Sequence, residues 1–142
     1  MTLARIRRAQ QADISALVDL SEQKRLQYQA YQPTFWRKAE DSRTKQHAYF
    51  EHLLAHESTL ILLHEDGSRI DGFVIASIVK APPVYDPRGL VCSVDDYCVA
   101  EGDLWQGVGL SLLDEVKQEA KQRNCVLVVV VCGHQDTLNA IC

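Results

Sequence analysis

The 142-residue chain lacks the features that mark several large classes of protein. It has no basic excess: its net charge of −4 at pH 7 argues against general nucleic-acid binding, which needs a strongly positive surface. Its longest apolar run, Val126 to Cys132, is far too short to cross a bilayer, and no signal peptide or lipidation motif is evident. We therefore expect one cytoplasmic domain over residues 1–142 that binds neither nucleic acid nor membranes.

Metal and redox motifs are missing as well. None of the five cysteines forms a C-x-x-C pair, so we expect free, mostly buried thiols in a reducing compartment. His52 and His56 lie one helical turn apart, but the glutamate and third ligand of a zinc motif are absent, so we expect two surface histidines and no metal. The cysteines are Cys92, Cys98, Cys125, Cys132 and Cys142.

The spacing of apolar residues predicts an α/β fold with a mixed sheet and helices on its faces, in the order β-α-α-β-β-β-α-β-(α). Strands are expected over residues 3–8, 59–64, 70–79, 89–99 and 125–132. Helices are expected after Asp13, over 43–56, over 107–123 and, beginning at Asp136, close to the last residue. The unbroken apolar character of 125–132 predicts a strand covered by helices on both faces. The apolar face of helix 107–123 comprises Val108, Leu112, Leu113, Val116 and Ala120.

The stretch between the fourth strand and this helix carries two glycines at its end. A helix start leaves unpaired N–H groups and a partial positive charge, which suit phosphate oxygens, and glycine lets a ligand approach the backbone closely. The dinucleotide fingerprint fails at Leu112, and no Gly-Lys-Ser/Thr of a Walker loop follows. By itself the pattern fits a phosphate site and a tight strand–helix junction equally well. The residues are Leu104, Trp105, Gln106, Gly107, Val108 and Gly109.

From Val99 to Leu113 the sequence resembles, without a gap, the V-x-P-x-x-R-G-x-G-I-G-x-x-L-L motif of the GNAT superfamily of N-acetyltransferases. The order of elements over most of the chain is similar too. The resemblance implies a GNAT-like acyl-CoA N-acyltransferase fold in a single domain. It also implies direct transfer of an acetyl group from acetyl-CoA to an amine of a small molecule or a peptide.

The same resemblance assigns residues to the cofactor. The pantetheine would pair with the backbone of Cys98, Val99 and Ala100, and the pyrophosphate would bind N–H groups between Leu104 and Gly109. Leu104 stands where the family usually has Gln or Arg, so one polar contact is missing. Asn139 falls on the family's N-x-x-A-x-x-L-Y helix and is the last cofactor residue that we expect.

The sequence departs from the family pattern after this helix begins. The chain ends before the Tyr that commonly protonates the CoA thiolate and before the last strand pair. Two explanations stay open: a partner, such as the second copy of a homodimer, completes the sheet, or the chain is a shortened member. A non-enzymatic acyl-CoA-binding or interaction protein is therefore the alternative to an N-acetyltransferase, and a nucleotide-binding module is the third hypothesis.

Asp96 and Asp95 are the candidate catalytic bases, because they interrupt the long strand where family members have a bulge. The alternative is that they bind bulge amides or a surface arginine. Since neighbours in a strand point to opposite faces, we expect only one to face the substrate, with Asp96 preferred. An acyl-cysteine on Cys98 is disfavoured, because a strand Cys is usually part of a core. Tyr85, in a proline-rich loop, is a candidate for shaping the acceptor pocket.

Overall fold

The computed structural model describes residues 4–130. Its strands are β1 (Arg5–Arg8), β2 (Thr59–Asp66), β3 (Arg69–Val79), β4 (Leu90–Val99) and β5 (Cys125–Val130). Its α-helices are α1 (Ile14–Tyr31), α2 (Ser42–Leu54) and α3 (Leu110–Gln122). The predicted order of elements is confirmed through β5. The expected helix from Asp136, which includes Asn139, lies outside the described residues, as do Cys132 and Cys142.

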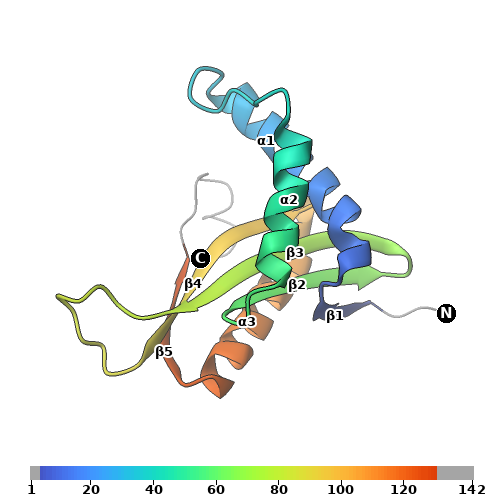
Figure 1. Ribbon diagram of the computed structural model, residues 1–142. Coiled ribbons are helices and arrows are strands. Elements are labelled where there is room, and N and C mark those ends of the chain that lie inside the picture. The colour runs from blue at the N-terminus through green and yellow to red at the C-terminus, as the bar shows by residue number, and fades with distance from the viewer. Residues whose placement is uncertain (1–3, 131–142) are drawn as a thin grey trace.

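The five strands form one sheet in chain order, β1-β2-β3-β4-β5 (Figure 1). The first four strands pair antiparallel; α1 and α2 lie in the connection from β1 to β2, and Gly67, with a φ of 64°, makes the tight β2–β3 turn. β4 and β5 pair in parallel, which requires a crossover, and α3 supplies it. The mixed α/β fold predicted from the sequence is thus confirmed.

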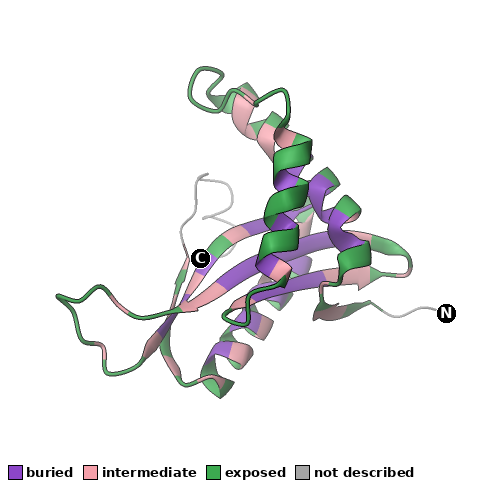
Figure 2. Cartoon of the chain, viewed as in Figure 1, coloured by how far each residue is buried: buried purple, intermediate pink, exposed green. Residues whose placement is uncertain are grey.

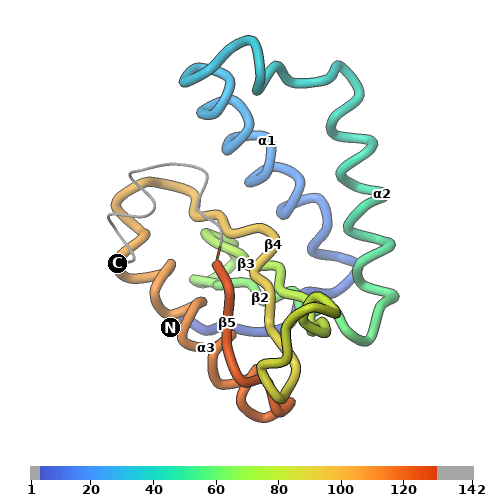
Figure 3. The backbone as a smooth tube through the Cα atoms, turned by 90° about the vertical axis from the view of Figure 1, so that its left-hand side faces the viewer, coloured from blue at the N-terminus to red at the C-terminus, as the bar shows by residue number. Residues whose placement is uncertain are grey.

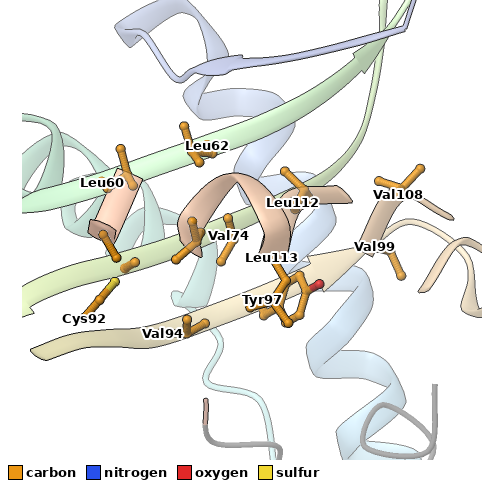
Figure 4. Close-up of a cluster of buried hydrophobic side chains, with 13 residues drawn as sticks. Leu60, Leu62, Val74, Cys92, Val94, Tyr97, Val99, Val108, Leu112 and Leu113 are labelled. Carbon is orange, nitrogen blue, oxygen red and sulfur yellow. The ribbon is translucent and has the colours of Figure 1, made fainter. Parts of the chain in front are cut away.

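Helices cover the two faces of the sheet unequally (Figure 2). One face packs against α3, and all five residues of its predicted apolar face are buried there (Figure 4). The other face packs against α1 and α2, around Phe50 and Phe73, whose ring centroids lie 5.8 Å apart. Among the described helices, none is long and apolar enough to span a membrane.

A bulge in β4 changes which face its side chains occupy. Ile75 on β3 opposes Asp96, and the next residue of β3 opposes Val94, so Asp95 is the extra residue. Val94 and Tyr97, on either side of the two aspartates, both pack in the core beneath α3. Both carboxylates therefore lie on the face of α1 and α2. The strict alternation that would put the two side chains on opposite faces is therefore wrong at the bulge, while the expectation that only one of them faces the substrate, with Asp96 preferred, stays a prediction.

In the part of the chain that the structure describes, helices cover only one face of β5, whereas the sequence predicted cover on both faces. Val128 and Val130 face the core beneath α3, whereas Leu127 and Val129 are 43% and 41% exposed. The reason is lateral placement: α1 contacts β3 and β4, and α2 contacts β2. Neither lies over β5 in the described part of the chain (Figure 3). The apolar run is thus the last of the described strands in the sheet, with one packed face.

Candidate active site

The pairing of β4 with β5 is described as far as Val94 and Val130, just before the bulge. Beyond it, the backbone N–H of Ala100 donates to the carbonyl of Asp71, 2.9 Å away. Because hydrogen-bonded pairs alternate in an antiparallel ladder, the backbone groups of Cys98 also point toward β3, and those of Val99 point away from it. Of the three residues assigned to pantetheine binding, Val99 thus presents its backbone outward.

The glycine-bearing turn is itself helical. Gly102–Leu104 forms a 3₁₀ turn and Trp105–Gly109 a π turn that continues into α3, so the helix starts earlier than the predicted residue 107. The first N–H groups of such a start have no acceptor within the helix, apart from that of Leu104, which donates to the carbonyl of Glu101 at 2.9 Å. The anion-binding character expected of this turn rests on those groups.

The two glycines of the turn have different reasons to be glycine. A Cβ on Gly109 would lie 2.8 Å from the ring of Trp105, which stacks edge-on against Tyr97 at 4.9 Å. The Tyr97 hydroxyl in turn donates to the carbonyl of Gly109. A Cβ on Gly107 would meet no atom within 4 Å. Gly109 is therefore needed for packing, as is Trp105, whereas Gly107 borders open space that a ligand can enter.

No cationic side chain belongs to the turn, since residues 102–109 contain no Lys or Arg and one acid, Asp103. Arg69 lies nearby, but it donates to the carboxylate of Glu101 at 2.7 Å. A pyrophosphate held here would thus depend on backbone N–H groups and the helix dipole.

The two aspartates of the bulge have different hydrogen-bond partners. Both oxygens of Asp95 accept hydroxyl hydrogen bonds, from Ser77 at 2.5 Å and from Ser93 at 3.1 Å. Oδ1 of Asp96 accepts from the ammonium of Lys24 at 2.5 Å and from the backbone N–H of Tyr97 at 2.9 Å. Oδ2 of Asp96 makes no hydrogen bond with a described residue. Asp96 therefore keeps one oxygen for a ligand, and Asp95 does not.

Charge and burial set the protonation states around this bulge. Burial disfavours the charged form of Lys24, but the adjacent Asp96 carboxylate outweighs it, so the pKa of Lys24 is above its ordinary value. Burial and the charges of Asp95 and Asp96 raise the pKa of Tyr49. Lys24 is thus an ammonium ion and Tyr49 a neutral phenol at neutral pH.

A cavity of about 500 Å³ opens above Asp96. Its walls come from α1, α2 and the connection between them, which lie together above the sheet in Figure 3. Buried Glu22 fixes that connection to α1, because its carboxylate accepts from Lys38 at 2.7 Å and from Ser42 at 2.6 Å. Sequence reasoning missed this pocket: its lining residues come from segments far apart in the chain and follow no motif.

Tyr85 is not part of this pocket. With the proline-rich loop it lines a separate cavity of about 530 Å³ beside Leu127 and Val129. Tyr85 therefore does not shape the cavity above Asp96, and its role in an acceptor pocket stays a prediction. His52 and His56 are exposed, as expected, with their Nε2 atoms 2.9 Å apart. The described residues hold no cluster of three or more His, Cys, Asp or Glu that could bind a metal.

Residues 21–141 match the model of the acetyltransferase (GNAT) family. The chain belongs to the GNAT family. The resemblance seen between Val99 and Leu113 is thereby confirmed, and family membership supports acyl transfer as the general class of reaction. A comparison with curated protein sequences finds no match.

Solved structures share the fold of this GNAT protein. A predicted acetyltransferase from Clostridium acetobutylicum, crystallised with acetyl-CoA, is 21% identical, with a TM-score of 0.72 over 92% of this chain and 81% of that one. The BH1408 protein of Bacillus halodurans, in a mutant form, is 19% identical, with a TM-score of 0.82 over 96% and 87%. The aminoglycoside N-acetyltransferase AAC(6')-Iy, in complex with CoA, is 16% identical, with a TM-score of 0.74 over 98% and 83%.

Proposed function

We propose that this GNAT protein is an acetyl-CoA-dependent N-acetyltransferase, acting as a single domain by direct transfer to an amine. The observation that carries the proposal is the bulge in β4. Asp96, whose Oδ2 makes no hydrogen bond with a described residue, lines the cavity at this bulge, and the outward-facing backbone of Val99 follows it. A donor at the strand edge and an acceptor in the cavity would then meet at the bulge.

Two features of the chain fit the donor. The backbone N–H and C=O of Val99 can pair with the amide groups of pantetheine, and the open space at Gly107 admits a pyrophosphate to the helix start. We keep Leu104 to Gly109 and Asn139 as proposals, and also Cys98 and Ala100, which would adjoin the donor without pairing with pantetheine because their backbone groups point toward β3. Two proteins of similar fold support the choice of donor, because the Clostridium acetyltransferase was crystallised with acetyl-CoA and AAC(6')-Iy with CoA.

The proposed reaction forms a C–N bond and breaks a C–S bond. The neutral amine attacks the thioester carbonyl carbon, and its surplus proton passes to Oδ2 of Asp96, directly or through a water molecule. The CoA thiolate then leaves and takes up a proton. Lys24 holds the other oxygen of Asp96 and so fixes its orientation, while Asp95, with both oxygens occupied, is not assigned a proton-transfer role.

The second candidate is acyl-CoA binding without catalysis. It is favoured by the ion pair between Asp96 and Lys24, because the ammonium group already occupies one oxygen of the proposed base. A small-molecule amine as acceptor is supported by the neighbours named as aminoglycoside acetyltransferases. The homodimer and the cytoplasmic location stay predictions; free Cys92, Cys98 and Cys125 support a reducing compartment.

Release of CoA thiol from acetyl-CoA across a panel of amines separates the two candidates. The transferase predicts amine-dependent thiol release and an acetylated product with the mass of one added acetyl group. Binding of acetyl-CoA with no amine-dependent release would instead establish the non-enzymatic candidate.

A further inference from the structure

We propose that the acceptor is an amine that carries a carboxylate on an apolar body, such as an α-amino acid with an aromatic side chain. This inference rests on the proposed acetyl transfer and names its substrate class. It comes from the cavity above Asp96, whose lining combines unbalanced positive charge with aromatic rings.

The lining of the cavity is strongly cationic. Its charged members are one carboxylate, Asp96, and five cationic residues: Lys24, Arg25, Arg37, Lys38 and Lys45. The three lysines have acidic partners, namely Asp96 at 2.5 Å, Glu22 at 2.7 Å and Asp41 at 3.4 Å. Neither arginine lies within 4 Å of a carboxylate among the described residues, so two positive charges remain without an ion pair.

Arg25 is held in the wall of the cavity. Its Nη2 donates to the side-chain oxygen of Gln46, but its Nη1 is buried without a hydrogen-bond partner in the described structure. The buried hydroxyl of Ser21, another lining residue, also lacks a partner. A buried, unsatisfied cationic group is costly, and an anion in the cavity would offset that cost.

Arg37 is exposed and makes no hydrogen bond with a described residue, so its planar guanidinium is available to a ligand. Guanidinium groups bind carboxylates through two parallel hydrogen bonds, which lysine cannot reproduce. We therefore assign Arg37 to direct binding of the carboxylate and Arg25 to electrostatic support.

Aromatic side chains supply the apolar part of the site. Tyr28, Phe35, Trp36 and Tyr49 line the cavity, and the ring of Trp36 lies 5.2 Å from Tyr28 and 4.6 Å from Phe35. Phe35 is 75% exposed, so a ligand can still cover its ring. The net positive charge opposes acceptors with several ammonium groups, such as aminoglycosides.

The test measures thiol release at saturating acetyl-CoA with four amines: phenylalanine, phenylalaninamide, phenethylamine and spermidine. The inference predicts that kcat/KM for phenylalanine exceeds that for the other three by about tenfold or more. Arg37→Gln should lower kcat/KM for phenylalanine by about tenfold or more, mainly through KM, and leave that for phenylalaninamide unchanged. Arg37→Lys should have a kcat/KM for phenylalanine between those of Arg37→Gln and the wild type, because lysine keeps the charge but not the paired hydrogen bonds.

Arg43→Gln is the matched control, since it removes a positive charge from α2 outside the cavity, where Arg43 pairs with exposed Asp19. It should leave the selectivity for phenylalanine unchanged. Preference for spermidine or for the two aromatic amines without a carboxylate, or equal losses for phenylalanine and its amide in Arg37→Gln, would overturn the inference while acetyl transfer stands. No thiol release with any amine would remove the proposed function and this inference with it.

Discussion

Asp96 and Asp95 are adjacent in sequence but are not equivalent in the structure. Asp96 keeps Oδ2 free beside the cavity, whereas both oxygens of Asp95 are bound to serine hydroxyls. Asp96→Asn should therefore lower kcat by about a hundredfold and leave the KM for acetyl-CoA unchanged, because it removes a proton acceptor and no cofactor contact. Asp95→Asn, the matched control, should lower kcat by less than about tenfold. Equal losses in steady-state kinetics would contradict the assignment.

Gly107 and Gly109 provide a second matched pair. Gly107→Val should fold with wild-type stability, because its side chain enters open space, but it should weaken acetyl-CoA binding by about tenfold or more. Gly109→Val should lower the free energy of unfolding by about 1–3 kcal/mol, since it clashes with Trp105. Thermal unfolding and calorimetric titration measure the two effects. Wild-type affinity in Gly107→Val would count against a phosphate site there.

Cys98 is a core residue and not a nucleophile in this structure. It is buried, its thiol lies 3.5 Å from the carbonyl of Leu20 on α1, and burial raises its pKa to about 12. Cys98→Ala should therefore retain near wild-type kcat, and the thiol should not react with a disulfide reagent in the native protein. An acetylated Cys98 found by mass spectrometry would contradict direct transfer.

Sequence reasoning proposed the residues of a cofactor site but named only Asp96 among the residues that line the cavity. The turn from Leu104 to Gly109 is a local motif, so its residues could be named before the structure. The pairing of Lys24 with Asp96 joins positions 72 residues apart. Nothing in the local spacing of Lys24 distinguishes it from any other cation on a helix. Contacts of this kind follow from tertiary packing alone.

At the scale of the elements, an ion pair joins β1 to the start of α1. The Arg7 guanidinium donates to both oxygens of Asp13 at 2.8 Å, and these bonds hold the pKa of Asp13 below its ordinary value. A lowered pKa stabilises the fold above the pKa of the unfolded chain, near 3.9, and this contribution disappears as the pH falls through the folded value.

Asp13→Asn should accordingly lower the free energy of unfolding by about 2 kcal/mol at pH 7, and the difference from wild type should shrink below about pH 4. Urea denaturation of both proteins at pH 7 and below about pH 4 measures this difference in the free energy of unfolding. Asp19→Asn is the control, because Asp19 is 65% exposed in its pair with Arg43 and should change stability little. A difference that stayed constant with pH would contradict the assigned role of Asp13.

The elements differ in how well the sequence predicted them. α3 has one apolar face, and all of its predicted core residues are buried. β5 is equally apolar, yet half of its described residues face outward. Composition could not predict this exposure, because it does not reveal where α1 and α2 lie relative to the edge of the sheet. The bulge was expected near Asp95 and Asp96 from the family resemblance. Its effect of turning both carboxylates to one face needed the strand register.

At the scale of the whole molecule, the proposed reaction would take place where the layers meet. The sheet separates the core beneath α3 from the cavity beneath α1 and α2, and the C-terminal part of β4 borders both. In the proposed arrangement, the donor would bind at the strand edge and the helix start, and the acceptor would bind on the face of α1 and α2. This division explains how the donor site can follow a family motif while the cavity has a charge pattern of its own.

Calorimetric titration of the full chain with acetyl-CoA, and in parallel with ATP, tests the central claim most directly. We predict saturable binding of acetyl-CoA with micromolar affinity, and much weaker binding of ATP, which lacks the pantetheine proposed to pair with the backbone of Val99. Absence of acetyl-CoA binding, or ATP binding of equal strength, would contradict it.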